Sequence, residues 1–326
     1  MCIRDRIQTT YNRFLKIADK DNIFIVTNEQ YVSIINEQLP GVDKSRILAE
    51  PMRKNTAPCI AYACHKIASI EPDANIIIAP SDHLMLNEEK FLYVLLEALE
   101  YTENMDVLVT LGIKPSRPDT GYGYIQFDET VVHRDIHKVK TFTEKPDMEL
   151  ARTFIKSGDF LWNSGIFIWN AKAIMAAFNK YQQDIHQAFW AARKAFGKKD
   201  ETRLMEKAYS ICPNISIDYA IMEQADNVFV IPAAFGWSDL GTWASLWENY
   251  EKDYYGNAVK GKNVMIYDST NCMVMVPDKK LVILQGLEDY IVIDTGDALL
   301  ICKKDKEQEI KEMTADIKRK ELDEYL

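Results

Sequence analysis

Apolar residues in the first half of the chain fall into short β-branched runs separated by longer stretches with helical spacing. The runs at 23–27, 75–79 and 107–112 have the length and composition of buried strands. Between them, 56–70 and 91–99 place apolar residues three and four positions apart, as amphipathic helices do. Strands that alternate with helices form βαβ units, so we predict an α/β, Rossmann-like domain with a mostly parallel sheet.

The pattern changes near residue 254. Strand-like runs follow one another without helical spacing between them, at 263–267, 272–276, 281–284, 290–294 and 298–302. After them, 304–326 is a highly charged stretch whose sparse apolar residues fit one stripe of a helix. We therefore predict two domains: an α/β domain at 1–253, and a small β domain with a C-terminal helix at 254–326.

Composition and charge limit the partners of this protein. The chain has 326 residues, of which 47% are hydrophobic and 27% charged, enough to bury a sizeable core. Its formal net charge is −10, whereas sequence-independent binding of nucleic acid requires a basic face. No apolar run approaches the ~18–20 residues that cross a bilayer. We therefore expect neither a nucleic-acid partner nor a membrane partner.

The six cysteines are scattered along the chain, without a second close pair to complete a zinc site. Such usage is typical of reduced thiols, so we expect a cytoplasmic protein. The start, MCIRDR, fits no element and is not followed by the apolar core of a signal peptide. We interpret it as a sequence-assembly scar in place of an earlier segment.

Asp82 and His83 follow the run 75–79 in the stretch NIIIAPSDHLML. Ligands of α/β sheets bind at the carboxyl ends of strands, which is where this pair falls. The pair is open to three interpretations: a metal ligand, an acid–base pair or an ordinary loop. Asp239 is another isolated carboxylate, set among aromatic residues and glycines in FGWSDLGTW. It is either a ligand of a hard cation together with Asp82, or the cap of the following helix.

Four further polar clusters interrupt the apolar pattern, and each has a structural interpretation beside a functional one. Asn55 and Thr56 open a helix, where they either cap it or hold a ligand near its free N–H groups. Glu144 and Lys145 suit a sugar hydroxyl and a phosphate, or form a solvated ion pair. The other two clusters either form turns or face a ligand: Tyr122-Gly123 in TGYGYI and Asn163-Ser164-Gly165 in WNSGIF.

Seven motifs occur in a recognisable order: EPMRKNTAP, IAPSDH, TGYGYI, FTEKP, WNSGIF, SIDYAIME and GWSDLGTW. Together they resemble the mannose-1-phosphate guanylyltransferase (GDP-mannose pyrophosphorylase) family of bacterial sugar nucleotidyltransferases, from about residue 7 to about residue 302. KNTAP, PSDH and WNSG favour the mannose/GTP branch over the glucose/dTTP branch. The resemblance implies a Rossmann-like nucleotidyltransferase domain, then a short left-handed β-helix segment, and it leads us to expect a homodimer.

The resemblance implies transfer of GMP from GTP to mannose 1-phosphate, which gives GDP-mannose and pyrophosphate. Asp82 and Asp239 would hold the catalytic Mg²⁺, and Lys145 would contact the phosphate of mannose 1-phosphate. The residues implied to line the substrates are Asn55, Thr56, Ala57 and Pro58 on the guanine side, and Tyr122, Gly123, Glu144, Asn163 and Gly165 on the mannose side, with Asp218 as a further lining residue. His83 has no implied role beyond packing or hydrogen bonding. A phosphate monoester is already a nucleophile, so no general base is required.

One feature of the family is absent from the sequence: the N-terminal loop GGxGxRLWPxSR and the later PKxF lysine, which cradle the triphosphate. We therefore expect a truncated gene model and little or no activity from the chain as printed. Three alternatives stay open: a non-catalytic regulatory or oligomerising relative, another sugar-1-phosphate nucleotidyltransferase, and a metal-dependent glycosyltransferase. Retention of Asp82, Lys145 and Asp239 disfavours the first, and the absence of a DxD motif around Asp82 disfavours the last.

Overall fold

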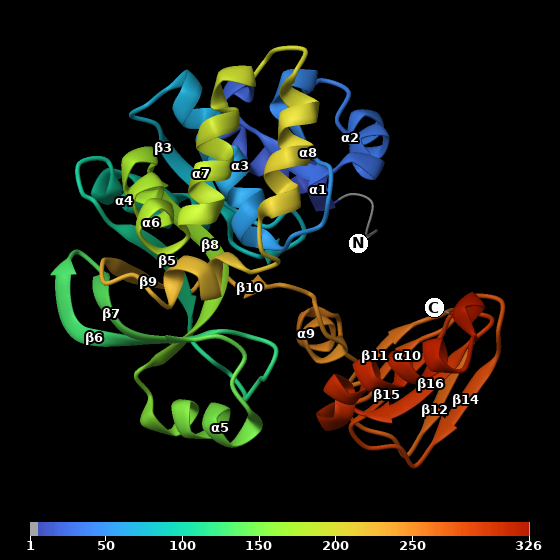
Figure 1. Cartoon of the computed structure of the whole chain (residues 1–326). Coiled ribbons are helices and arrows are strands. Elements are labelled where there is room, and N and C mark those ends of the chain that lie inside the picture. The colour runs from blue at the N-terminus through green and yellow to red at the C-terminus, as the bar shows by residue number, and fades with distance from the viewer. Residues whose placement is uncertain (1–5, 326) are drawn as a thin grey trace. The chain divides into compact units, whose positions relative to one another are not determined.

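The computed structural model describes residues 6–325, except for the side chains of residues 131, 132 and 323. Cys2 and most of the MCIRDR start therefore lie outside the described residues. The chain forms two compact units, one ending at Trp237 and the other beginning at Ser238. In Figure 1 the second unit is the orange and red part of the chain.

The main sheet of the first unit has six strands in the order β3-β8-β5-β9-β7-β6. The strands are β3 (Asn75–Ile78), β5 (Leu108–Ile113), β6 (Tyr124–His133), β7 (Ile136–Thr143), β8 (Phe160–Asn170) and β9 (Val228–Ala233). β3, β5, β6 and β9 run in one direction, as the mostly parallel sheet predicted from the sequence requires. Adjacent strands nevertheless pair in parallel only between β5 and β9, because β8 and β7, which run the opposite way, lie between the others. The short β6–β7 connection itself requires an antiparallel pair.

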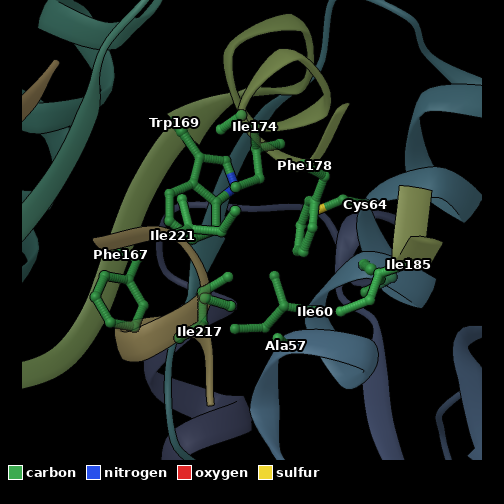
Figure 2. Packing of buried hydrophobic residues seen from close by; sticks show 14 of the residues in the cluster. Ala57, Ile60, Cys64, Phe167, Trp169, Ile174, Phe178, Ile185, Ile217 and Ile221 are labelled. Carbon is green, nitrogen blue, oxygen red and sulfur yellow. The ribbon is translucent and has the colours of Figure 1, made fainter. Parts of the chain in front are cut away.

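Two layers of helices cover the two faces of this sheet. Side chains of a strand alternate between faces, so Phe167 and Trp169 of β8 enter one core and Ile166 and Ile168 enter the other. Figure 2 shows the first core, where Trp169 lies near Phe178 and other helix residues. The helices of this core are α3 (Thr56–Ile70), α6 (Ala171–Tyr181), α7 (Gln183–Ala192) and α8 (Glu201–Ile211), and α4 (Glu88–Thr102) packs in the second core. The helix predicted at 56–70 is confirmed.

The start of the first unit adds a small layer of its own. Its elements are α1 (Arg6–Phe14), β1 (Ile25–Asn28), α2 (Val32–Gln38) and β2 (Ile47–Glu50). In the described part of the chain, β1 and β2 pair in parallel as a separate two-stranded sheet. Ile35, Leu39 and Val42 form a small buried cluster beside them. A further helix, α5 (Met148–Ser157), follows β7.

The second unit is a coil of short strands that ends in a helix. Its first sheet contains β11 (Ala258–Lys260), β13 (Met273–Met275), β15 (Tyr290–Asp294) and β16 (Leu299–Lys303), and its second contains β12 (Val264–Tyr267) and β14 (Val282–Gln285). Successive strands from β11 to β15 alternate between the two sheets, and all pairs are parallel except β15–β16. This is a β-helix-like arrangement, and with α10 (Ile310–Arg319) it confirms the architecture expected of the C-terminal part.

The boundary between the two units, at Trp237 and Ser238, lies earlier in the sequence than the change of pattern near residue 254. The reason is α9 (Trp243–Asn249), which belongs to the second unit. Trp243, Leu246 and Trp247 pack against the buried core of the β-helix-like strands. None of the helices in residues 6–325 combines the length and the apolar character that crossing a bilayer requires.

Candidate active site

Asp82 and His83 lie in the turn between β3 and the short strand β4 (Leu84–Met85). The Asp82 carboxylate is exposed and makes no hydrogen bond or ion pair with the residues that the structure describes. His83 is part of the packing instead: its Nδ1 accepts a hydrogen bond from Nε1 of Trp237 at 3.1 Å, and the two rings meet edge to face. The structure therefore separates the pair into a free carboxylate and an engaged imidazole.

The start of α3 exposes two of the four residues predicted for the guanine side. Asn55 is the N-cap, with a φ of +66°, a value that asparagine tolerates better than most residues. Its side-chain oxygen accepts a hydrogen bond from the Thr56 N–H at 2.9 Å. Ala57 is fully buried and Pro58 is buried, so their side chains serve the packing of the helix. Asn55 and Thr56 are the exposed pair.

A short segment, 215–217, holds this helix start in place. The Ala57 N–H donates to the carbonyl of Ile215 at 3.1 Å, and the Ile215 N–H donates to the carbonyl of Lys54 at 3.3 Å. The Thr56 hydroxyl accepts a hydrogen bond from the Ile217 N–H at 2.9 Å. Asp218 follows Ile217 directly, so this segment joins the residues predicted for the guanine side to those predicted for the mannose side.

Asn163 is the centre of a polar network inside β8. Its Oδ1 accepts from the Thr110 hydroxyl at 3.1 Å and from the Gly165 N–H at 3.2 Å, and its Nδ2 donates to Oδ1 of Asp218 at 2.8 Å. The pairing of β5 with β8 shifts register between Thr110 and Gly112. Gly165 has a φ of +70°, which suits such an irregular strand. The polar interruption in WNSGIF is therefore a bulged strand with its amide held in a fixed position.

Glu144 and Lys145 lie at the end of β7. The Glu144 side chain is 7% exposed, and its carboxylate is 2.7 Å from Nζ of Lys145, whose side chain is 56% exposed. The Glu144 N–H donates to Oε1 of Glu223 at 3.0 Å, and the Lys145 N–H donates to the carbonyl of Tyr122. Gly123 leaves room for this arrangement, because a Cβ there would overlap Oε2 of Glu144. The alternative interpretation of Glu144 and Lys145 as a fully solvated ion pair does not fit, because the Glu144 side chain is buried.

The charges of this cluster are coupled. Burial raises the pKa of Asp218 to about 6, the negative charge of Glu144 adds to the rise, and the Asn163 hydrogen bond and Lys145 oppose it. Burial acts to lower the pKa of Lys145, but the hydrogen bond and charge of Glu144 outweigh it and the pKa is raised. The result is one partly exposed ammonium beside two largely buried carboxyl groups. Such a set can accept hydrogen bonds from sugar hydroxyls and attract a phosphate.

The raised pKa of Asp218 makes a testable contribution to stability. The folded pKa of about 6 lies above the ordinary 3.8, so the folded state binds the extra proton between these values. The stabilising contribution is complete below about pH 3.8 and is lost as the pH rises through about 6. We expect the free energy of unfolding of the native protein, relative to Asp218→Asn, to fall by about 2 kcal/mol from pH 4.5 to pH 7.5.

Urea unfolding at several pH values measures this difference. Asp226→Asn is the matched control, because the Asp226 side chain is 90% exposed and pairs only loosely with Lys180. Parallel pH profiles for the native protein and Asp218→Asn would contradict the assignment.

A half-buried carboxyl group outside this cluster, which the sequence did not indicate, supports the loop that leads to Asn55. The Glu50 carboxylate, at the end of β2, accepts a hydrogen bond from the hydroxyl of Tyr209 at 3.0 Å, and Tyr209 is fully buried. Burial raises the pKa of Glu50, and the hydrogen bonds from Tyr209 and Cys59 oppose the rise. The chain from Glu50 to α3 is thereby tied to α8.

Replacement of Tyr209 by phenylalanine is expected to lower the free energy of unfolding by about 1–3 kcal/mol, because a buried acceptor loses its donor. Chemical denaturation monitored by circular dichroism measures the change. Tyr93→Phe is the control, since the Tyr93 hydroxyl bonds Glu97 on an exposed helix face and its loss should cost less than about 0.5 kcal/mol. Equal effects of the two substitutions would show that Glu50 does not depend on Tyr209.

Asp239 lies in the second unit, in the turn before α9. Its Oδ1 accepts from the Gly241 N–H at 2.9 Å, and the intervening Leu240 has a φ of +49°. The interpretation of Asp239 as the cap of α9 is wrong, because Thr242 is the N-cap and forms a reciprocal capping box with Ser245. The Asp239 carboxylate shapes the turn.

The predicted metal site combines carboxylates of two units. Asp82 belongs to the first and Asp239 to the second, so their joint binding of an ion stays a prediction. Across residues 6–325, no group of three or more His, Cys, Asp and Glu side chains is arranged to hold a metal ion. An exposed carboxylate without a hydrogen-bond partner among the described residues, such as Asp82, does fit a hard divalent cation as one of its oxygen ligands.

Three residues around the candidate site were not predicted from the sequence: Thr110, Glu223 and Glu50. Thr110, which positions Asn163, is a fully buried hydroxyl in the apolar run LVTLGI, and the need of a buried hydroxyl for a partner was a usable signal. Glu223 and Glu50 carried no such signal, because each looks like an ordinary exposed acid at the end of an element. Only the packing around them shows their role.

Comparison with known proteins places these observations in a family. The nucleotidyl transferase family model matches residues 4–254, and the MannoseP isomerase/GMP-like beta-helix domain model matches residues 261–316. The mannose-1-phosphate guanylyltransferase of Salmonella montevideo is 35% identical over 328 residues, which cover 98% of this chain and 68% of that protein. The alginate biosynthesis protein AlgA of Pseudomonas fluorescens is 36% identical over 312 residues, 94% of this chain and 64% of that protein.

A solved structure described as mannose-1-phosphate geranyltransferase from Thermus thermophilus matches with a TM-score of 0.81 and 26% identity, over 96% of this chain and 89% of that one. The chain therefore spans less than two thirds of the AlgA relative but most of the solved structure. Both family models, the guanylyltransferase relative and the structural match agree with the motifs and with the two-unit fold. The chain belongs to the nucleotidyl transferase family, in its mannose-1-phosphate guanylyltransferase branch.

Proposed function

We propose that this protein transfers GMP from GTP to mannose 1-phosphate, giving GDP-mannose and pyrophosphate. The observation that carries the proposal is the convergence of Glu144, Lys145, Asn163 and Asp218, which come from three separate elements, into one hydrogen-bonded cluster of the first unit. Buried acceptors beside a partly exposed ammonium suit the hydroxyls and the phosphate of a sugar phosphate. The name of the Salmonella montevideo relative supports the choice of mannose.

In this proposal a phosphate oxygen of mannose 1-phosphate attacks the α-phosphorus of GTP in line. A new P–O bond forms to the GMP group, the bond to the β-phosphate bridging oxygen breaks, and pyrophosphate leaves with the electron pair. The protein contributes orientation and charge, and no proton has to be removed from the attacking phosphate. Lys145 holds the attacking phosphate, while Glu144 and the Asn163–Asp218 pair orient the sugar.

The guanine side is assigned to the start of α3. Asn55 and Thr56 are exposed there, and their backbone is held by segment 215–217. Asn55 has both amide and carbonyl groups with which to bond the edge of a base. Because Asp218 follows the same segment, a base and a sugar bound at these two places would lie on opposite ends of one rigid connection.

We propose a divalent cation, Mg²⁺, as the cofactor, with Asp82 and Asp239 as its protein ligands. Mg²⁺ bound there would offset the negative charge of the phosphates. The support from this chain is the chemistry of the donors, which are hard carboxylate oxygens, and the exposure of Asp82 at the end of a strand.

We also propose a cytoplasmic homodimer. Five of the six cysteines lie in the described residues, and all five are free thiols, as a reducing compartment would keep them. The β-helix-like part of the chain exposes Leu281, Ile283, Leu299 and Ile301, each by more than half, and such apolar groups suit an interface. Light scattering tests the dimer, and a mass near the 37.6 kDa of one chain would contradict it.

Pyrophosphate release with GTP, mannose 1-phosphate and Mg²⁺ tests the proposed reaction. We would assay the 326-residue chain beside a version that carries any upstream codons of the same reading frame. We expect turnover from the extended chain and little from the printed one. An extended chain that binds GDP-mannose but releases no pyrophosphate would identify a non-catalytic relative. Preference for glucose 1-phosphate would identify another branch of the nucleotidyltransferases.

A further inference from the structure

A pocket of about 660 Å³ opens on the first unit, away from every residue assigned above to the substrates. It lies among the last turns of α3, the start of α6 and the end of α7, and its volume is typical of sites for small organic ligands. Its floor contains His65, Ala171 and His186, and its rim contains Lys172, Trp190, Arg193 and Lys194. Neither the family resemblance nor the proposed reaction uses any of these residues.

The floor carries two imidazole nitrogens without partners among the described residues. His65 is 2% exposed, and its Nδ1 lies 2.8 Å from the carbonyl of Ala61, so this nitrogen carries the proton and donates. Its Nε2 and the Nδ1 of His186 are buried and form no hydrogen bond of normal geometry with the described residues, although the backbone of His186 approaches the His65 ring. Burial lowers the pKa of His65 to about 4 and also lowers that of His186, so both rings are mostly neutral at pH 7. Unpaired buried acceptors are costly, and a ligand N–H or O–H that reaches one removes the cost.

An aromatic wall stands beside these nitrogens. The rings of His186 and Trp190 are stacked, with centroids 5.8 Å apart and planes inclined by 21°. His65 approaches His186 at a centroid distance of 5.2 Å. Trp190 is 48% exposed, and its ring is part of a stack, because the Arg193 guanidinium also lies 3.7 Å from the ring centre. A planar ligand can pack against such a stack of flat side chains.

The rim is positively charged, although the chain as a whole carries a net charge of −10. None of the described residues that line the pocket is acidic. Lys172 is paired with Asp73 at 2.5 Å, whereas Arg193 and Lys194 form no ion pair with any described residue. The Arg193 guanidinium lies 3.7 Å from the centre of the Trp190 ring, which joins the charge directly to the aromatic wall.

We propose that this pocket binds a planar heteroaromatic anion of the size of a nucleoside monophosphate. The ring of the ligand packs against the stacked side chains of His186, Trp190 and Arg193 with an N–H toward the imidazole nitrogens, and the phosphate meets Arg193 and Lys194. A metal ion between the two histidines is the competing occupant. It is disfavoured because the described lining residues offer no carboxylate or thiolate and include three cationic side chains.

Methyl NMR of the full chain tests this proposal at the pocket itself. Met175 lines the pocket, and its ¹³C-labelled methyl signal can be assigned by its absence from Met175→Leu. The probes are AMP, GMP, adenosine, inorganic phosphate and Zn²⁺. We expect AMP and GMP to shift the Met175 signal saturably with dissociation constants below about 1 mM, and adenosine and phosphate to bind at least ~10-fold more weakly.

Variants separate this pocket from the proposed active site. Arg193→Gln combined with Lys194→Gln should weaken AMP binding about 10-fold, and His186→Phe, which keeps a ring but loses both nitrogens, about 5-fold. Lys145→Met, in the proposed mannose site, should leave the Met175 shift unchanged. Thermal unfolding shows whether each variant is folded, which matters for Arg193 because its guanidinium also donates a hydrogen bond to the Trp190 carbonyl.

Four results would overturn the proposal. They are no Met175 shift with AMP or GMP up to about 10 mM, equal binding of phosphate and AMP, equal binding of adenosine and AMP, and unchanged binding in the folded Arg193/Lys194 variant. Tight binding of Zn²⁺ that shifts the ring signals of both histidines would instead assign the pocket to a metal. Because the readout is at Met175, failure here leaves the proposed nucleotidyl transfer untouched, and failure of that reaction leaves this pocket untouched.

Discussion

Replacement of Lys145 by methionine is expected to lower the rate of pyrophosphate release by ~10²–10³-fold in the extended chain, with a rise in the KM for mannose 1-phosphate. The Lys145 ammonium is the cation of the Glu144–Asp218 cluster, and its side chain is 56% exposed, so it can turn from Glu144 to a bound phosphate. Methionine keeps the length of the side chain but not the charge. The KM for GTP should change little, because the guanine side is assigned to the start of α3.

The matched control for this prediction is Lys140→Met. Lys140 lies on the same strand, β7, and its side chain pairs with Asp128 with an exposure of 49%. Its replacement should leave the rate within about twofold of the native value. Lys145→Arg should recover part of the lost rate, since it keeps the charge but not the shape of an ammonium. Near-native turnover of Lys145→Met, with unchanged KM for mannose 1-phosphate, would remove Lys145 from the site.

Replacement of Asp82 by asparagine should abolish Mg²⁺-dependent turnover, a loss of ~10³-fold or more. The Asp82 carboxylate is exposed and unpaired among the described residues, so the substitution removes a charge without removing a structural contact. We therefore expect an unchanged thermal unfolding midpoint. Asp239→Asn should have a similar effect on turnover, and it keeps the Oδ1 acceptor that the Gly241 N–H uses.

Asp73→Asn is the control for the effect of removing a surface carboxylate. Asp73 lies just before β3, is 71% exposed and pairs with Lys172, so its loss should leave turnover within about twofold. Isothermal titration of Mg²⁺ in the presence of GTP adds a second readout, and both aspartate variants should lose affinity. If Asp82→Asn turns over at a near-native rate, the carboxylate at the end of β3 is not a metal ligand.

The helices and short strands of the first unit could be predicted because their signals are local. α3 begins at Thr56, where the hydroxyl of Thr56 and the ring of Pro58 predict the start of a helix. It ends at Ile70, the last apolar position of the helical pattern. The strand before Asp82 was equally clear, since a short β-branched run bounded by polar residues is typical of a buried strand.

The middle of the chain was harder to predict, because its strands depend on distant partners. β8 is one continuous strand of 11 residues, although Asn163, Ser164 and Gly165 interrupt its apolar pattern. The network from Thr110 to Asp218 compensates the polar groups, and neither residue is near Asn163 in the sequence. In the sheet, β8 lies between β3 and β5. A succession of βαβ units does not predict this position.

In the candidate site, too, the sequence motifs indicated most of the residues, whereas their surroundings depend on distant parts of the chain. The motifs singled out Asp82, Glu144, Lys145, Asn163 and Asp218, and the structure brings the last four together. His83, the neighbour that suggested acid–base chemistry, bonds Trp237, which is 154 positions away. Glu50, which looked like a surface acid, is held by Tyr209 from 159 positions away.

The sequence by itself determined the type and order of most elements, the two-part organisation and the residue types available for phosphate and sugar chemistry, because periodicity, caps and motifs are local properties of a chain. Only the tertiary structure decided which polar side chains are buried, and burial is what raises the pKa of Asp218 and holds Glu144 against Lys145. It also decided that the Asp82 carboxylate has no partner among the described residues while His83 bonds Trp237, and that His65 of α3 and His186 of α7 meet in a pocket away from the candidate site. Contacts between residues far apart in the sequence create these environments, and no local pattern encodes them.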